Sequence, residues 1–185
     1  MEPRDMNWVY EEIRTFAYLH AAAAWALQQA DSAKDRQMFA SMHAILASVH
    51  CLEAFTNHLG PRYFGEEWDT REANLKAPRE KLKALLDHFD IPVADVQADY
   101  DSYLLGLKIR KELTHGRTHE ISKPGGRGGN VTASHPSWHR HCEPKTARRV
   151  FDAVTSIVER LGEASGDGRL CWGILGHGVG WQKPN

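Results

Sequence analysis

The stretch from residue 38 to residue 59 constrains the fold more than any other part of the chain. Its apolar residues recur at three- and four-residue spacing: Met38, Met42, Ile45, Val49, Leu52 and Leu59. That spacing places them on one face of an α-helix. The Gly60-Pro61 pair that follows predicts the end of the helix. So long an apolar face must be covered by other elements, and a helix of this kind packs most simply against other helices.

Four further segments are predicted to be helical. They are residues 6–30, 78–89, 95–114 and 144–161. The alanines within the first favour helix, and Pro78 and Pro144 suit the first position of theirs. Residues 60–77 are expected to connect two helices. No run of alternating apolar and polar residues competes with these helices, so we predict an all-α fold, a bundle of four to five helices.

One long segment separates the last two predicted helices. Gly116 is expected to end the helix before it in a left-handed cap, and the loop 116–143 is rich in Gly, Ser, Pro and His. Loops of this length in compact domains are commonly functional or disordered. We predict one helical domain over residues 1–163, with its core at about 36–161. The tail 164–185 is expected either to dock as an extended segment or to stay mobile.

Composition narrows the setting of the protein. The chain has 185 residues, of which 42% are hydrophobic, enough for one compact domain. Its longest apolar run, residues 21–27, is too short to span a membrane. The first residues lack the layout of a signal peptide. Three widely spaced cysteines do not make a disulfide framework. We therefore expect a cytoplasmic protein without a membrane partner.

Positive charge is concentrated in one part of the chain. The whole sequence has a net charge of -1, yet residues 108–149 hold ten Lys or Arg against three Glu. This segment therefore carries +7 and the remainder -8. Such a basic region is typical of proteins that bind phosphate groups. The alternative is that loops and the C-termini of helices collect cations in any protein.

The basic region begins at the end of the helix predicted over 95–114. Its apolar stripe, which includes Leu107, continues at helical spacing onto Arg110, Lys111 and Thr114. Lys111 and His115 are four residues apart and share a face. The helix dipole favours the charged form of a histidine at this end. The charged end is either a catalytic site or the solvated end of a helix.

A polar line runs beside the apolar stripe of the helix predicted over 38–59. His50, Glu53 and Asn57 follow one another at three- and four-residue spacing. A carboxylate such as Glu53, if it lay near Arg110, would orient the guanidinium group. The alternative is that this line is only a solvated helix face.

Two stretches together, "ASVHCLEAFTNHLG" and "IRKELTHG", resemble the HEPN domain superfamily over about residues 36–161. Members of that superfamily are all-α bundles, often symmetric dimers, and many are metal-independent ribonucleases with an Arg-x4–6-His motif at the C-terminal end of a helix. The resemblance implies that Arg110 and His115 form this motif, with Lys111 as the polar residue that commonly follows the arginine. Arg14–His20 and Arg36–His43 match the looser spacing, but they lack the placement before a glycine at a helix end.

The resemblance implies an endoribonuclease that serves as a toxin or a defence effector. In such an enzyme the 2′-hydroxyl of RNA attacks the adjacent phosphate. His115 would transfer protons, Arg110 and Lys111 would bind the phosphate, and Glu53 or Asn57 would position Arg110 or the ribose. A homodimer would supply a second histidine. The alternative is a non-catalytic HEPN-like module that binds a protein partner or a nucleotide.

One departure from the family concerns regulation. HEPN toxins with nucleotidyltransferase antitoxins often carry a tyrosine two residues after the histidine, which the antitoxin modifies. Here that position is Arg117. Regulation by that route is therefore not expected, although an antitoxin partner is not excluded.

The loop 116–143 offers further candidate residues. Arg117, Arg127 and Trp138 are expected to contact RNA, with Trp138 stacking on a base. Residues competent to bind zinc also occur here: His115, His119, His135, His139, His141 and Cys142. However, the chain has no CxxC or HExxH motif. We expect no metal and no other cofactor.

Overall fold

The computed structural model describes residues 9–32, 34–75, 77–116, 136–166, 172 and 175–179. Within these residues there are six α-helices: α1 Thr15–Ser32, α2 Gln37–Phe64, α3 Glu67–Asn74, α4 Pro78–His88, α5 Gln97–Thr114 and α6 Pro144–Ala164. Two short 3-10 helices, η1 Val93–Val96 and η2 His139–His141, precede α5 and α6. Strands β1 Val9–Ile13 and β2 Leu175–Val179 form an antiparallel pair. The folded body is thus all-α, as predicted.

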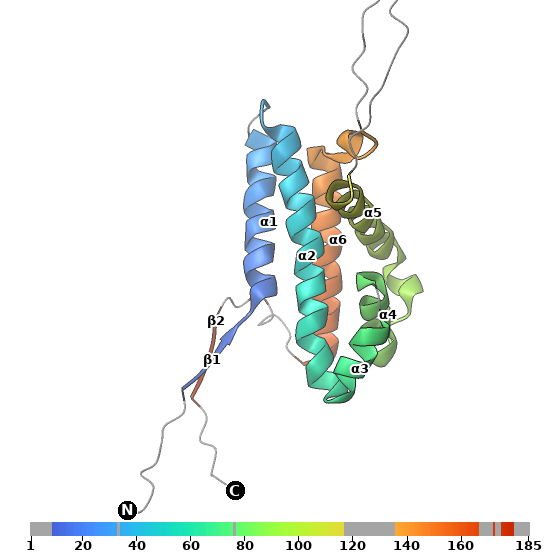
Figure 1. Ribbon diagram of the computed structural model, residues 1–185. Coiled ribbons are helices and arrows are strands. Elements are labelled where there is room, and N and C mark those ends of the chain that lie inside the picture. The colour runs from blue at the N-terminus through green and yellow to red at the C-terminus, as the bar shows by residue number, and fades with distance from the viewer. Residues whose placement is uncertain are drawn as a thin grey trace, which may run out of the picture.

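Helix α2 is the centre of the bundle. It lies side by side with α1 and α6. Helix α5 lies on the side of α2 and α6 that is away from α1, and α4 and α3 lie below α5 in the view of Figure 1. The residues that define the apolar face of α2 are fully buried from Ile45 to Leu59, whereas Met38 and Met42 are partly buried. Helix α6 buries Val150, Val154 and their neighbours against the same core. For α2 and α6 the helical periodicity therefore identified the buried face correctly.

Gly106 brings α5 close to the central layer. A Cβ atom at this position would lie 2.7 Å from Cγ2 of Val49 on α2 and 3.0 Å from Cγ1 of Val150 on α6. Those distances are shorter than ordinary van der Waals contact. The absence of a side chain at Gly106 is therefore what lets α5 pack against both helices. This contact fixes the position of the following turns, which carry Arg110.

The predicted end of α2 at Gly60-Pro61 is wrong. The helix continues through Pro61 to Phe64 and ends at Gly65, whose φ of 55° is in the left-handed region. The indole of Trp68 packs so closely on Gly60 that a Cβ there would overlap it. Trp68 is the buried anchor of α3. The predicted connector 60–77 therefore contains a helix, held by a contact that periodicity does not reveal.

The first helix also differs from the prediction. It begins at Thr15 instead of Met6, because residues 9–13 form β1 and pair with β2, Val9 opposite Val179 and Ile13 opposite Leu175. The partner strand is more than 160 residues away in the sequence, so local patterns carry no sign of it. The tail was expected either to dock as an extended segment or to stay mobile, and its residues 175–179 form an extended strand that pairs with β1. The remaining parts of the tail, apart from residues 164–166 and 172, lie outside the described residues.

The end of α5 lacks the left-handed glycine that the sequence suggested. The helix ends at Thr114, and the capping residue is His115, with a φ of -108°. Among the described residues, the glycines with positive φ are Gly65 and Gly166. The amide of His115 donates a hydrogen bond to the carbonyl of Lys111 at 3.0 Å. His115 is thus held by the last helical turn itself.

Helix α2 is long and apolar enough to cross a membrane by length and composition. Its most apolar window has a mean hydropathy of 1.3, and 44% of that window is buried inside the fold. The central helix of a bundle meets the same criteria, because it must be apolar to fill the core. The burial of α2 between α1, α5 and α6 explains its composition.

Candidate functional site

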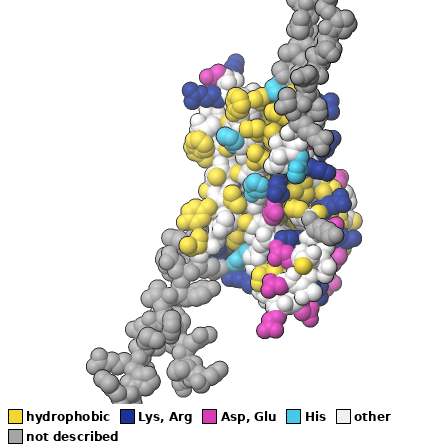
Figure 2. Space-filling model, viewed as in Figure 1, with side chains coloured by type: hydrophobic (Ala, Val, Ile, Leu, Met, Phe, Trp, Pro, Cys, Tyr) yellow, Lys and Arg dark blue, Asp and Glu magenta, His cyan; other side chains and the backbone are white. Residues whose placement is uncertain are grey.

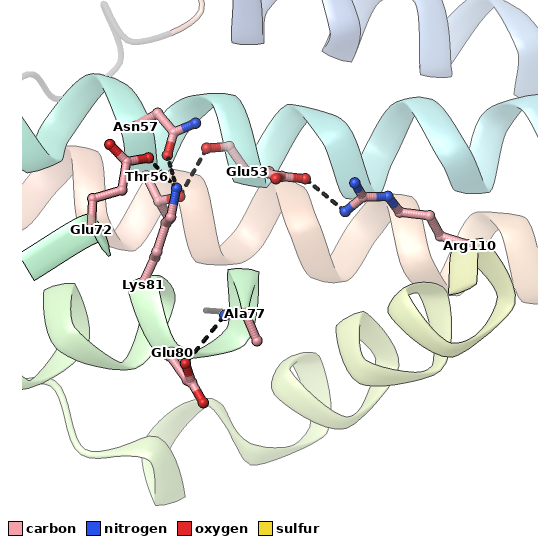
Figure 3. A network of polar contacts seen from close by, with 8 residues as sticks. All are labelled: Glu53, Thr56, Asn57, Glu72, Ala77, Glu80, Lys81 and Arg110. Atoms are coloured by element: carbon pink, nitrogen blue, oxygen red, sulfur yellow. Dashed lines mark hydrogen bonds and ion pairs between the residues drawn. The ribbon is translucent and has the colours of Figure 1, made fainter. Parts of the chain in front are cut away.

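Arg110 lies where α5 passes over α2. Its Nη1 donates a hydrogen bond to Oε2 of Glu53 on α2 at 2.7 Å, and the two side chains are 29% and 26% exposed (Figure 3). A short, partly buried bond between a guanidinium and a carboxylate is strong and directional. Glu53 therefore fixes the direction in which Arg110 points. The pairing that the sequence suggested between these two residues is present.

His50 and Tyr103 lie near this ion pair. Burial lowers the pKa of His50, and the charge of Arg110 lowers it further, while Glu53 acts in the opposite sense. Burial and the charge of Glu53 raise the pKa of Tyr103 well above its ordinary value. The Tyr103 hydroxyl has no hydrogen-bond partner among the described residues. Both groups are therefore neutral near pH 7, and Arg110 and Glu53 carry the charge at this contact between α2 and α5.

A pocket of about 620 Å³ opens beside Arg110, between the start of α4 and the last turns of α5. We call it the α4–α5 pocket. Its walls hold cationic and polar side chains and a smaller apolar group: Arg79, Lys108, Arg110, Lys111, Thr114 and His115, with Ala77, Pro78, Leu104 and Leu107. Lysine and arginine side chains gather on the side of the molecule where α5 lies, with hydrophobic side chains between them (Figure 2). The chemistry of this pocket suits an anion.

The three residues proposed as catalytic all line this pocket. Arg110 is half-buried, whereas Lys111 and His115 are exposed at the end of α5. Arg110 reaches the same pocket as Lys111 and His115, although Arg110 and His115 are five residues apart. The reason is that the pocket wraps around the end of α5, so that more than one helix face contributes to it.

Two residues of the pocket were missed by the sequence analysis. Lys108 precedes Lys111 by three residues, a spacing that puts both on one helix face and was visible in the sequence. Arg79 comes from the first turn of α4, and no sequence pattern links it to α5. In that turn the amide of Ala77 donates to Glu80 at 3.2 Å, and Pro78 takes the first helical position. These features fix the start of α4 at the pocket edge.

Asn57 does not support Arg110. Its Oδ1 accepts a hydrogen bond at 2.9 Å from Lys81 of α4, which also binds Glu72 of α3 (Figure 3). Asn57 lies one helical turn beyond Glu53, where α4 rather than α5 covers α2. The prediction that Asn57 could position Arg110 is therefore not met in this arrangement. Asn57 belongs to a separate network that ties α2, α3 and α4 together.

Most of the predicted RNA-binding loop lies outside the described residues. Arg117 and Arg127 both fall in that part of the chain. Trp138 is described: it is partly buried and packs against the core, and its neighbour Ser137 donates a hydrogen bond to Glu112 of α5 at 2.6 Å. The indole of Trp138 is therefore engaged at least in part by the protein itself, which limits the face available to a base.

The residues competent to bind zinc do not converge within the described part of the chain. No group of three or more His, Cys, Asp or Glu side chains there has a metal-binding arrangement. His119 and His135 lie outside the described residues. Cys142 is buried, and burial raises the pKa of its thiol. That protonated thiol is a poor ligand.

Comparison with known proteins gives no identification. No family model, no curated protein and no solved structure matches this chain significantly. The likeness to the HEPN superfamily therefore rests on the sequence stretches quoted above, and function has to be argued from the α4–α5 pocket.

Proposed function

We propose that this protein is a metal-independent endoribonuclease of the HEPN type. The observation that carries the proposal is the convergence of Arg110, Lys111 and His115 on one pocket, with Arg110 held by Glu53. Two cations, one of them held by Glu53, and an imidazole at the edge of a pocket are a suitable set for phosphodiester chemistry. The RNA-binding role, the cytoplasmic location and service as a toxin or defence effector belong to the same proposal.

The reaction needs two proton transfers and charge stabilisation. One imidazole takes the proton of the 2′-hydroxyl, whose oxygen forms a bond to the adjacent phosphorus, and the bond from phosphorus to the 5′ oxygen breaks. A second acid protonates that leaving oxygen, which yields a 2′,3′-cyclic phosphate and a free 5′-hydroxyl. His115 is exposed and performs one of these transfers. Arg110 and Lys111 neutralise the charge that develops on the phosphate.

A homodimer supplies the second imidazole in this proposal. Each chain contributes one His115, so two copies that face each other across the pocket provide an acid and a base. The exposure of His115 and Lys111 at the end of α5 leaves them accessible to a second chain. An antitoxin or other protein partner would regulate the enzyme by covering the same surface.

The test is cleavage of total RNA by purified protein in the presence of EDTA. Wild-type protein should yield fragments with 2′,3′-cyclic phosphate ends, and folded His115→Ala protein should yield none. Equal cleavage by both proteins would refute the assignment of His115. No cleavage by a correctly folded wild-type protein would refute the ribonuclease itself.

A second candidate is a non-catalytic module that binds a protein partner or a nucleotide. The observation in its favour is that Arg110 is already bound to Glu53, an arrangement also found in purely structural ion pairs. In that case the wild-type protein would not cleave RNA, and Arg110→Ala would only lower stability. A pull-down with the wild-type protein, compared with His115→Ala, would then be the way to find the partner.

A further inference from the structure

The α4–α5 pocket has more cationic groups than the proposed catalytic set uses. Arg79 projects from the first turn of α4, and Lys108 lies one turn before Lys111 on α5. Among the described residues, no carboxylate pairs with Arg79 or Lys111, and Lys108 approaches Glu112 only to 4.0 Å in an exposed pair. Uncompensated like charges around one pocket repel one another. An anionic ligand that bridges the two walls would relieve that repulsion.

The pocket also has an apolar wall. Leu104 and Leu107 of α5 face it, together with Ala77 and Pro78 at the start of α4. Both leucines are partly buried, so they lie along the wall between the core and the open side. The volume of about 620 Å³ is within the range of roughly 300–1,000 Å³ that small-ligand pockets occupy. A phosphate ion alone would leave this wall and most of the volume unused.

We infer that the α4–α5 pocket holds one unpaired nucleotide of an RNA strand, its base against the leucine wall and its phosphates between Arg79 and Lys108. This inference rests on the proposed function and names the form of RNA that the site accepts. The base of a duplex is stacked and paired, with its phosphates outside, and cannot enter a pocket between two helix ends. Single-stranded RNA can splay a base into such a pocket.

The start of α4 gives Arg79 a defined position at the pocket. Pro78 occupies the first helical position and the Glu80 side chain caps the amide of Ala77, so this turn has a defined direction. A phosphate near Arg79 interacts with its guanidinium group. Arg79 can also lie flat on the base, as arginine does in many RNA sites.

Binding measurements can test this inference without any cleavage. The protein would be the full chain carrying His115→Ala, so that the RNA stays intact. Its affinity would be measured for a single-stranded RNA oligonucleotide, for the same sequence as a duplex, for 5′-AMP and for inorganic phosphate. The site should prefer the single strand over the duplex and 5′-AMP over phosphate. Equal affinities within either pair would overturn the inference.

A matched pair of variants tests the position of the site. Arg79→Gln removes a cation that lines the pocket, and Lys83→Gln removes an exposed cation one turn further along α4, outside the pocket lining. Arg79→Gln should weaken single-strand binding by about five- to tenfold, the loss expected for one charged phosphate contact. Lys83→Gln should change it less than twofold. Equal effects of the two substitutions would place the nucleotide elsewhere.

The outcomes separate this inference from the proposed function. Selective single-strand binding that depends on Arg79, with no cleavage by wild-type protein, would refute the ribonuclease and leave the nucleotide site standing. Cleavage by wild-type protein with equal binding of single strand and duplex would leave the ribonuclease standing and refute the nucleotide site.

Discussion

Two cations tie neighbouring helices to the same face of α2, and they differ in how completely they are used. Lys81 of α4 binds both Asn57 and Glu72, and its side chain is only 12% exposed. Arg110 of α5 binds Glu53, its one acceptor among the described residues, and is 29% exposed beside a pocket. A guanidinium has five N–H donors. Lys81 is thus largely satisfied by the protein, whereas Arg110 keeps donors for a ligand.

The comparison teaches that an ion pair by itself does not distinguish a structural from a functional cation. The two networks lie about one helical turn apart on α2 and look alike in sequence, since Glu53 and Asn57 belong to one polar line. What separates them is the neighbouring helix. Lys81 of α4 is held between α2 and α3 by its bonds to Asn57 and Glu72. The end of α5, in contrast, leaves Arg110 at the edge of the α4–α5 pocket.

The largest expected effect is on RNA cleavage at the Arg110 side. Arg110→Ala and His115→Ala should each reduce cleavage by roughly 10²–10⁴-fold. In the proposed reaction, the first substitution removes the side chain that binds the phosphate, and the second removes a proton-transfer group. Initial rates on a labelled single-stranded RNA would measure this. Circular dichroism of each variant is the control for folding. A loss below tenfold for Arg110→Ala would remove the functional distinction between Arg110 and Lys81.

The next effect is on stability at the Lys81 side. Lys81→Met should lower the free energy of unfolding by about 1 kcal/mol, because the exposed Asn57 and the partly exposed Glu72 lose the charged hydrogen-bond donor that ties α2 and α3 to α4. Its RNA cleavage should stay within about threefold of wild type. Urea denaturation monitored by helical signal would give the stability. If Lys81→Met abolished cleavage in a folded protein, the Lys81 network would have to be part of the site.

These two networks also show how far the sequence alone could lead. The spacing of the polar line on α2 and of the charged end of α5 was sufficient to suggest a contact between Glu53 and Arg110, because both lie beside apolar stripes that must face the core, but it left a solvated helix face as the alternative. It was not sufficient for Asn57, since its partner Lys81 depends on how α4 packs. Arg79 was missed for the same reason.

The errors in the helix boundaries have a common physical origin. Gly60-Pro61 is a strong local signal for a helix end, yet the packing of Trp68 on Gly60 carries α2 one turn further. Residues 9–13 continue the apolar pattern of α1, yet they pair with a strand near the other end of the chain. In both cases a contact distant from the local pattern overrides it, and such contacts leave no periodicity.

A smaller effect concerns the pH dependence of stability. Burial and the nearby Arg110 lower the pKa of His50 in the folded protein, and its value in the unfolded chain is about 6.5. The unfolded chain therefore binds more protons below pH 6.5. As far as His50 determines it, the free energy of unfolding is highest above that pH. It decreases as the pH falls toward the pKa of His50 in the folded protein. Burial acts in the same sense on His20.

Unfolding measured at several pH values from 7.5 to 5 would show this dependence. His50→Gln should reduce the loss of unfolding free energy at low pH. Arg110→Gln should reduce it in part, because it removes the positive charge that, after burial, lowers the pKa of His50. His43→Gln, which removes an exposed histidine two turns earlier on α2, is the matched control for the loss of an imidazole from this helix. Identical curves for wild type and His50→Gln would contradict the placement of His50 beside Arg110.

The smallest expected effect sharpens the comparison within the α4–α5 pocket itself. Lys111 is exposed and makes no ion pair among the described residues, so in the proposed reaction it would act on the phosphate as a mobile point charge. Lys111→Gln should reduce cleavage by about three- to tenfold at low salt, and the difference from wild type should shrink as ionic strength rises.

Arg110→Lys should reduce cleavage by more than Lys111→Gln, because a lysine cannot both bind Glu53 and present a planar fork to the phosphate. Rates at 20 mM and 300 mM salt, about a fourfold change in Debye length, would separate the two substitutions. If Lys111→Gln were as damaging as Arg110→Lys at both salt concentrations, the fixed orientation that Glu53 gives to Arg110 would have no catalytic value.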